Sequence, residues 1–119
     1  MDCGGHGTHC SGIIGGNDGK VLGVAPGVTF GAYRVFGCDG SASTEVIIAG
    51  LERAYLEGMD IINLSLGQNQ GWKDAPDAVV ASRIADSGVI VVAAQGNEGA
   101  QGLWHASNPV SVLFLFFRF

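Results

Sequence analysis

The residue in this chain that is best placed to do chemistry is His6, which lies in the sequence GGHGTHC. Glycines flank it, and residues 4–16 are predicted to form a short helix that opens at this glycine turn. The positive end of a helix dipole favours a neutral imidazole there, and a neutral imidazole is what a general base needs. His6 is therefore a candidate for proton transfer.

A second histidine, His9, follows His6 at a spacing that could also bind a metal ion. A metal site needs further ligands, and no Glu or third ligand accompanies the pair. We therefore predict no metal site, and we expect His9 to be a structural, hydrogen-bonded residue. The sequence GGNDGK that follows lacks the spacing of a phosphate-binding loop.

Apolar runs with the length of β-strands occupy residues 28–35, 60–66 and 89–94. The second and third are apolar almost throughout, which is typical of strands in a sheet covered on both faces. Polar residues follow each run, at 36–41, 65–67 and 95–99, and ligands of parallel α/β sheets bind beyond the carboxyl ends of the strands. These loops are therefore the predicted ligand-facing edge.

Two segments with the apolar spacing of helices lie between the predicted strands. Ser43 is an N-cap for a first helix that Gly58 ends, and Asp74 or Ala75 caps a second helix that Gly88 ends. On the second helix we expect one side to carry Val79, Val80, Arg83, Ile84 and Ser87. Strands alternating with helices predict an α/β fold, a doubly wound parallel sheet with right-handed βαβ crossovers.

The composition excludes several classes of protein. The chain is 47% apolar and 14% charged with a mean hydropathy of +0.31, which argues against intrinsic disorder. A net charge of −5 offers no basic stripe for nucleic acid. The longest apolar stretch, residues 112–117, is far shorter than the roughly 20 residues of a membrane span. The first residues lack the pattern of a secretory signal.

Cys3, Cys10 and Cys38 are an odd number of cysteines, so they cannot all pair within the chain. One bridge with one thiol and three buried thiols both remain open. We expect Cys10 and Cys38 to act as small buried apolar side chains.

The sequence resembles a subtilisin-type serine peptidase between residues 2 and 109. The resemblance is carried, in the family's order, by GHGTH with SGII, GVAP, INLSLG and VAAQGNEG. The expected domain organisation is therefore a partial subtilisin-like peptidase domain over 1–109, followed by an apolar tail, 110–119, that does not resemble the family. The fold implied is part of the subtilisin-like sheet.

The resemblance also implies roles. His6 matches the catalytic histidine, and Asn97 matches the asparagine whose side chain donates a hydrogen bond to the oxyanion. The matched substrate-binding positions are an apolar subsite at Phe36, backbone strands at Gly40 and at Ser65, Leu66 and Gly67, and a pocket wall at Ala94, Gln95 and Gly96. Asp2 matches an acidic residue near the histidine motif and is not the triad aspartate.

Two members of the triad are missing from the pattern. No DTG-like motif precedes His6 and no GTSMA-like motif follows Asn97, so we expect this chain alone to be an inactive fragment of a serine endopeptidase. The tail is expected to be a truncation or a read-through product. No cofactor is identifiable, although calcium is common in the family. The expected partner is a peptide or protein substrate, and the family implies an extracellular location.

Two alternatives come from other classes. The first is a non-catalytic α/β fragment that binds extended peptides through an edge strand near Ser65. The second is a nucleotide-binding domain, which ranks lower because no G-x-G-x-x-G follows a strand.

Overall fold

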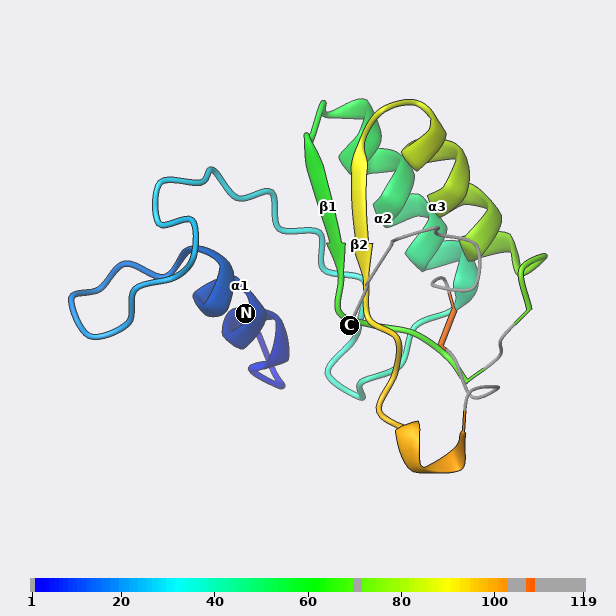
Figure 1. Ribbon diagram of the computed structural model, residues 1–119, viewed down its shortest axis with the longest axis horizontal. Coiled ribbons are helices and arrows are strands. Elements are labelled where there is room, and N and C mark those ends of the chain that lie inside the picture. The colour runs from blue at the N-terminus through cyan, green and yellow to red at the C-terminus, as the bar shows by residue number, and fades with distance from the viewer. Residues whose placement is uncertain (1, 70–71, 103–106, 109–119) are drawn as a thin grey trace. The chain divides into compact units, whose positions relative to one another are not determined.

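The computed structural model in Figure 1 describes residues 2–69, 72–102 and 107–108. Contacts divide the chain into two compact units, residues 1–42 and 43–119. The expected apolar tail at 110–119 lies outside the described residues. The predicted parallel α/β arrangement is found in the second unit.

Helix α2, Thr44–Leu56, begins directly after its N-cap Ser43, as predicted. Gly58 follows the helix with φ +75°, a left-handed conformation that glycine adopts at little cost. Helix α3, Pro76–Asp86, has Ala75 at its N-cap and a proline at its first position, where the missing N–H removes no helical bond. The sequence therefore located both helices to within a residue or two.

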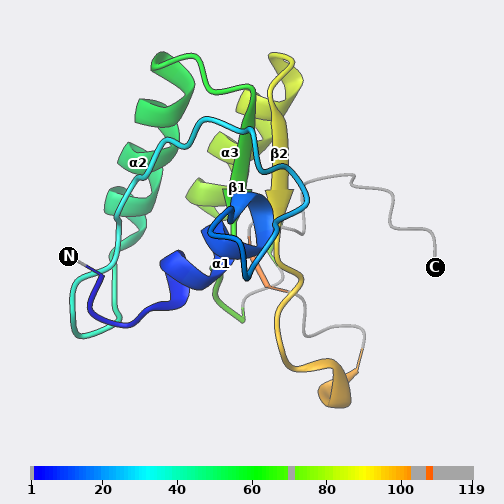
Figure 2. The same ribbon diagram turned by 90° about the vertical axis from the view of Figure 1, so that its left-hand side faces the viewer.

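Strands β1, Ile61–Leu64, and β2, Ile90–Ala93, pair in parallel, with Ile61 opposite Ile90 at one end and Leu64 opposite Ala93 at the other. Helix α3 is the connection between them. Figures 1 and 2 show α2 and α3 on the same face of this sheet. Parallel pairing through a helix is confirmed, whereas a sheet wound on both faces with right-handed crossovers stays a prediction.

The hydrophobic core lies between the two helices and the sheet. Burying each large aliphatic side chain there contributes about 1.5–3 kcal/mol. Among the described residues the buried apolar side chains are Ile47, Leu51, Ala54, Ile62, Leu64, Ala78, Ala81, Ile84 and Val91. All of them belong to the second unit.

The buried residues of α3 are mostly not those that the sequence placed together on one side of the helix. Ala78 and Ala81 are fully buried and Ile84 nearly so, while Val79 and Val80 are half-buried. Because α3 contacts both α2 and β2, small alanines stand where the helix approaches its neighbours most closely. The half-buried valines flank that contact, so the sequence put the helix in the right place without indicating which of its faces is buried.

The first unit holds helix α1, His6–Gly15, which begins after Gly5 at φ +76° and buries none of its residues. An antiparallel bridge between Asn17 and Leu22 closes the turn that follows α1. The segment after this turn contacts the end of the helix. A Cβ on Gly15 would lie 2.8 Å from side-chain atoms of both Val28 and Phe30. Only glycine allows this close approach.

The prediction of a strand over 28–35 is wrong, because the structure assigns no β-strand there. A strand is defined by a ladder of hydrogen bonds to a neighbour, and apolar alternation alone does not supply one. Here Val28 and Phe30 use their side chains against Gly15 instead.

Within the described ranges, no helix combines the length and apolar character needed to cross a bilayer.

Candidate functional site

The residues that follow β1 and β2 leave the parallel sheet side by side. A cavity of about 130 Å³ opens between them, which we call the strand-end pocket. It is lined by Ser65, Leu66, Gly67, Asn69, Ala94, Gly96, Asn97, Glu98 and Ser107. The polar loops predicted to face a ligand after these two strands are therefore adjacent.

The loop after β1 is fixed at its start by short hydrogen bonds. The Ala94 N–H donates to the carbonyl oxygen of Leu64 over 3.0 Å, which extends the ladder past the last paired residues. The Asn63 side-chain amide donates to Ser65 Oγ over 2.9 Å. Ser65 and Leu66 thus leave the sheet in a defined direction along one wall of the pocket.

The loop after β2 folds back on itself at Asn97. The Asn97 N–H donates to Glu98 Oε2 over 2.9 Å, and Gly96 has φ +111°. A Cβ on Gly96 would lie 3.1 Å from that carboxylate oxygen, so conformation and space both favour glycine. Asn97 is exposed and is therefore accessible to a ligand in the strand-end pocket.

Most of the predicted second-unit site residues line this pocket. The exception is Gln95, which lies in the loop without lining the cavity. Asn69, Glu98 and Ser107 line it without having been assigned a role from the sequence. The position of Glu98, next to Asn97 in the polar run, could have indicated it. No local signal marks Ser107, because it reaches the pocket only through tertiary contacts.

His6 is the first residue of α1 and is exposed. Its Nε2 lies 3.8 Å from the Cys10 Sγ, one helical turn further along. Cys10 is a free thiol and is only half-buried, so the expectation of a small buried apolar side chain is wrong. The reason is that α1 buries none of its residues and offers no core for the thiol to enter.

Asp2 caps the helix that carries His6. Its Oδ2 accepts hydrogen bonds from the Thr8 hydroxyl at 2.6 Å and the Thr8 N–H at 3.0 Å, and its Oδ1 accepts from the Gly5 N–H at 2.8 Å. The Thr8 hydroxyl and the backbone N–H groups together hold the pKa of the Asp2 carboxyl well below its usual range. Asp2 is therefore ionised at neutral pH and fixes the first turn of α1.

A disulfide joins Cys3 to Cys38, which are 35 positions apart in the sequence. The expectation of a buried apolar role for Cys38 is thus wrong, and one bridge with one free thiol is the arrangement found. The bridge connects the turn before α1 to the loop at 36–41.

The loop at 36–41 contains the predicted substrate residues Phe36 and Gly40. The Asp39 carboxylate accepts hydrogen bonds from the Ser41 hydroxyl at 2.8 Å and the Ser41 N–H at 3.3 Å, and these lower the pKa of Asp39. Phe36 is half-buried, and Gly40 adopts φ +77°. His6, Phe36 and Gly40 belong to the first unit and the remaining predicted site residues to the second.

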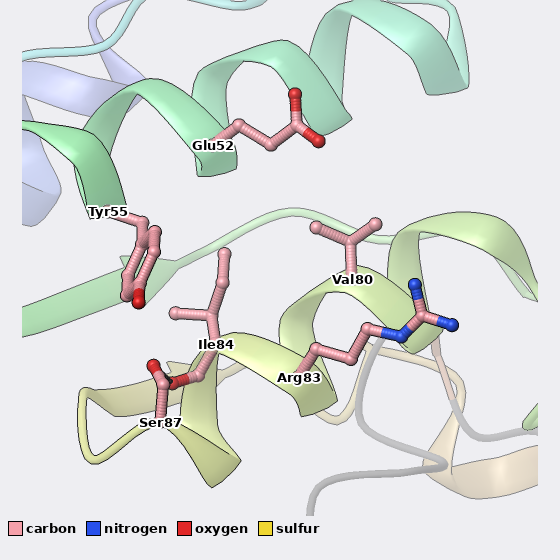
Figure 3. Close-up of a pocket in the computed structure, with 6 residues that line it drawn as sticks. All are labelled: Glu52, Tyr55, Val80, Arg83, Ile84 and Ser87. Carbon is pink, nitrogen blue, oxygen red and sulfur yellow. Dashed lines mark hydrogen bonds between the residues drawn. The ribbon is translucent and has the colours of Figure 1, made fainter.

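A larger groove of about 310 Å³ lies between α2 and α3. Figure 3 shows that its walls are side chains of the two helices: Glu52, Tyr55, Val80, Arg83, Ile84 and Ser87. It includes four of the residues that the sequence placed on one side of the second helix. None of the candidate site residues lines it, and within the described residues no three metal-binding side chains gather.

Comparison with known proteins gives the family of this chain. The model of the Subtilase family matches residues 1–113. The chain belongs to the subtilase family. This is a family of serine peptidases, so the resemblance carried by the GHGTH and QGNEG sequences is confirmed.

Relatives of this subtilase chain have peptidase names. It is 42% identical over 104 residues to the minor extracellular protease Vpr of Bacillus subtilis (strain 168), covering 87% of this chain and 13% of that protein. Subtilisin DY of Bacillus licheniformis is 42% identical over 103 residues, covering 85% and 37% respectively. The extracellular serine proteinase of Thermus sp. (strain Rt41A) is 41% identical over 113 residues, covering 93% and 26%.

The subtilase chain thus spans between 13% and 37% of the length of these relatives. The match covers both units of the structure, including His6 in the first and the strand-end pocket in the second.

Proposed function

We propose that this chain is the part of a subtilase catalytic domain that supplies the general base, an oxyanion donor and one side of the peptide-binding cleft. The observation that carries the proposal is the strand-end pocket, in which the backbone of Ser65 to Gly67 and the loop with Asn97 line one cavity. The family match supports the assignment of a peptidase chemistry to these residues.

In the proposed reaction, the His6 imidazole takes the proton from a serine hydroxyl as that oxygen attacks the peptide carbonyl. It then gives the proton to the leaving amine. The exposed position of His6 at the first turn of α1 suits this exchange with a bound substrate. This chain has no recognisable motif for the serine or the aspartate of the triad. In the proposal, other parts of the catalytic domain supply these two residues.

Asn97 is assigned to the negative charge that develops on the carbonyl oxygen. Its side-chain amide is a neutral donor, and the hydrogen bond from its own N–H to Glu98 fixes the loop that carries it. A donor held in place before the reaction needs no reorganisation as the charge develops, which is why such groups contribute strongly to the rate.

The substrate is proposed to be an extended peptide. Ser65, Leu66 and Gly67 continue from the end of β1 and line the pocket. An extended peptide can pair with such a segment by adding a strand, with a side chain entering the adjacent cavity. Phe36 is assigned to an apolar subsite and Gly40 to a backbone segment that binds the substrate, and Ala94, Gln95 and Gly96 to the pocket wall.

A chimeric subtilisin DY tests the catalytic assignments. Residues 2–109 replace the matching segment, and the chimera is compared with its His6→Ala, Asn97→Ala and Asn69→Ala forms in a peptide-cleavage assay. Loss of kcat by about 10⁶ for H6A and about 10²–10³ for N97A is expected; both figures were established on subtilisin itself and are adopted from it. N69A is the matched control, since Asn69 lines the same pocket.

Equal turnover in N97A and N69A would contradict the oxyanion role. Retained turnover in H6A would contradict the general-base role. A chimera that folds but cleaves nothing before substitution would count against the whole assignment.

The chain by itself is proposed to be inactive and to bind peptides only. Incubation with a fluorophosphonate should leave it unmodified, whereas parental subtilisin DY in the same experiment should be labelled on its serine. Covalent labelling of the chain would show a reactive serine and overturn this proposal. An extracellular location is proposed from the names of the Bacillus subtilis and Thermus relatives, both of which are called extracellular.

A further inference from the structure

The turn that carries His6 is built from residues that cannot hold it in place themselves. Gly5 stands at the N-cap of α1 and has no side chain to accept the free N–H groups of the first turn, and Gly7 follows His6 directly. Glycine loses more conformational freedom on folding than any other residue, so a turn of this composition is costly to order. The constraint on the turn must therefore come from another side chain.

Asp2 supplies that constraint, because its two carboxylate oxygens act on opposite sides of His6. On the side before His6, Oδ1 accepts hydrogen bonds from the Gly4 N–H at 3.1 Å and the Gly5 N–H at 2.8 Å. On the side after it, Oδ2 accepts from the Thr8 N–H at 3.0 Å and the Thr8 hydroxyl at 2.6 Å. One side chain thus ties the chain both before and after His6.

The carboxylate of Asp2 lies close to the whole turn. A Cβ on Gly7 would lie 3.9 Å from Oδ2, which is an ordinary van der Waals distance. The Thr8 hydroxyl and the Gly5 N–H, one from each side of His6, are the two largest causes of the lowered pKa of Asp2. Hydrogen bonds to an ionised carboxylate are shorter and stronger than neutral ones, so both ties hold at neutral pH.

The imidazole of His6 depends on this turn for its direction. Within the described ranges its ring makes one polar contact, with the Cys10 Sγ at 3.8 Å from Nε2. The residue is exposed and α1 buries none of its residues, so no core packs against the ring. The rotamers open to a side chain are set by the φ and ψ of its own residue, and the turn fixes these for His6.

We propose that Asp2 is a positioning residue for His6, which holds the imidazole in one orientation by tying the turn on both sides of it. Asp2 acts through the backbone of residues 4–8 and takes no part in proton transfer. A catalytic group that is already held near its productive geometry raises the rate of the chemical step. This consequence rests on the proposed role of His6 as general base, whereas the fixed orientation does not.

The experiment uses the whole chain in four substituted forms. Asp2→Ala removes both ties. Thr8→Val removes the hydroxyl donor and keeps the shape of the side chain, and Thr8→Ser restores the hydroxyl. Asp18→Ala is the matched control, because Asp18 is also exposed and its Oδ1 also accepts two backbone N–H groups, at 2.9 and 2.8 Å, but in the turn that follows α1.

The first measurement is NMR spectroscopy of the free chain, in which the nuclear Overhauser effect between the His6 ring and the Cys10 β-protons reports the orientation of the ring. Asp2→Ala should abolish this effect and Thr8→Val should weaken it, because the ring then samples several rotamers. Thr8→Ser should restore the effect, and Asp18→Ala should leave it unchanged.

Amide exchange in the same samples shows where each variant loosens the chain. Exchange at Gly5 should rise by roughly three- to tenfold in Asp2→Ala, the factor that one net hydrogen bond supplies. Exchange at Gly16, whose N–H donates to Gly12 at the other end of α1, should stay unchanged and show that the helix is intact. If Asp2→Ala also loosens Gly16, the comparison of Thr8→Val with Thr8→Ser decides.

The second measurement is peptide cleavage by the subtilisin DY chimera described above, with kcat taken per serine that a fluorophosphonate labels, so that unfolded enzyme does not contribute. Thr8→Val should lower kcat by about 10- to 100-fold and leave KM unchanged, since misplacing a catalytic group affects the chemical step. Thr8→Ser should restore kcat, and Asp18→Ala should keep the kcat and KM of the unsubstituted chimera.

The outcomes separate the two proposals. A ring orientation that is the same in wild type, Asp2→Ala and Thr8→Val overturns the positioning role, whether or not the chimera is active. Loss of the orientation in Asp18→Ala as well would mean general loosening of the first unit and would also overturn it. A disturbed ring in Thr8→Val with unchanged kcat in an active chimera overturns the role of His6 as general base and leaves the fixed orientation supported.

Discussion

The two units of this chain are stabilised in different ways. In the second unit, two helices cover a parallel sheet and enclose aliphatic side chains such as Leu51, which is 2% exposed. In the first unit, α1 buries none of its residues and Ile13 is 57% exposed. Its described constraints are the Asp2 cap, the disulfide and close glycine contacts.

This difference concerns the proposed chemistry directly. His6 belongs to the unit that is held by polar and covalent links, and Asn97 to the unit that is held by a core. A hydrophobic core resists local opening, whereas a helix with exposed backbone hydrogen bonds and few apolar contacts opens at low cost. We therefore expect the base to depend on capping and cross-linking, and the oxyanion donor to depend on packing.

The largest effect that separates the units is expected from core truncation. Leu51→Ala should destabilise the second unit by about 2–5 kcal/mol, because it leaves a cavity in packed surroundings. Ile13→Ala on α1 is the control and should change stability by less than about 0.5 kcal/mol. Both stability changes can be measured by urea unfolding in which amide exchange is monitored separately in each unit. Equal losses for the two variants would contradict the contrast between the units.

Removal of the disulfide should act on the first unit. Cys3→Ser with Cys38→Ser should lower its stability by about 2–4 kcal/mol, since the unfolded chain gains conformational freedom. Cys10→Ser is the control, as Cys10 is not bridged. The measurement is amide exchange at Gly16, whose N–H donates to Gly12 at the end of α1. Equal exchange in the double variant and in C10S would rule out a stabilising role for the bridge.

Replacing a glycine by alanine should change stability in opposite directions at two positions, one in each unit. Gly12→Ala, in the middle of α1 with nothing within 4 Å of the new Cβ, should stabilise that helix by about 0.5–1 kcal/mol. Gly58→Ala, also with open space but at φ +75°, should destabilise α2 by about 1–2 kcal/mol. Thermal unfolding by circular dichroism detects both. A stabilising G58A would mean that backbone strain does not decide this position.

The smallest effect is expected from the Asp2 cap. Because hydrogen bonds lower the folded-state pKa of this carboxyl, its contribution is complete above the ordinary aspartate pKa of about 3.9. That contribution is lost as the pH falls from about 4 towards the lower folded-state pKa. Exchange protection of the Thr8 amide should therefore decrease below about pH 4 in the wild type, and Asp2→Asn should remove this pH dependence. An identical pH profile in the variant would show that another group is responsible.

Local signals predicted most of the elements. Ser43 and Gly58 delimit α2, and an apolar run of strand length marks each paired strand, because caps and side-chain periodicity are properties of neighbouring residues. The apolar run at 28–35 gave a wrong strand prediction for the same reason. Such a run indicates only a tendency to be buried, whereas a strand also needs a neighbouring strand, which is not a local property.

The candidate site was only partly accessible to this reasoning. His6 and the residues from Ala94 to Asn97 lie in short motifs, so their types and spacing indicated them. Ser107 lies far along the chain from Gly67, and no spacing rule connects them. Its contacts depend on how the chain returns to the sheet after β2.

By itself, the sequence determined the family, the two helices and two strands of the second unit, and the polar loops at the strand ends, because each is encoded in a short contiguous segment. Only the tertiary structure decided the pairing of Cys3 with Cys38, the inner face of α3 and the place of Ser107 in the strand-end pocket. These depend on which distant segments of the chain meet, and the preferences of neighbouring residues do not set that.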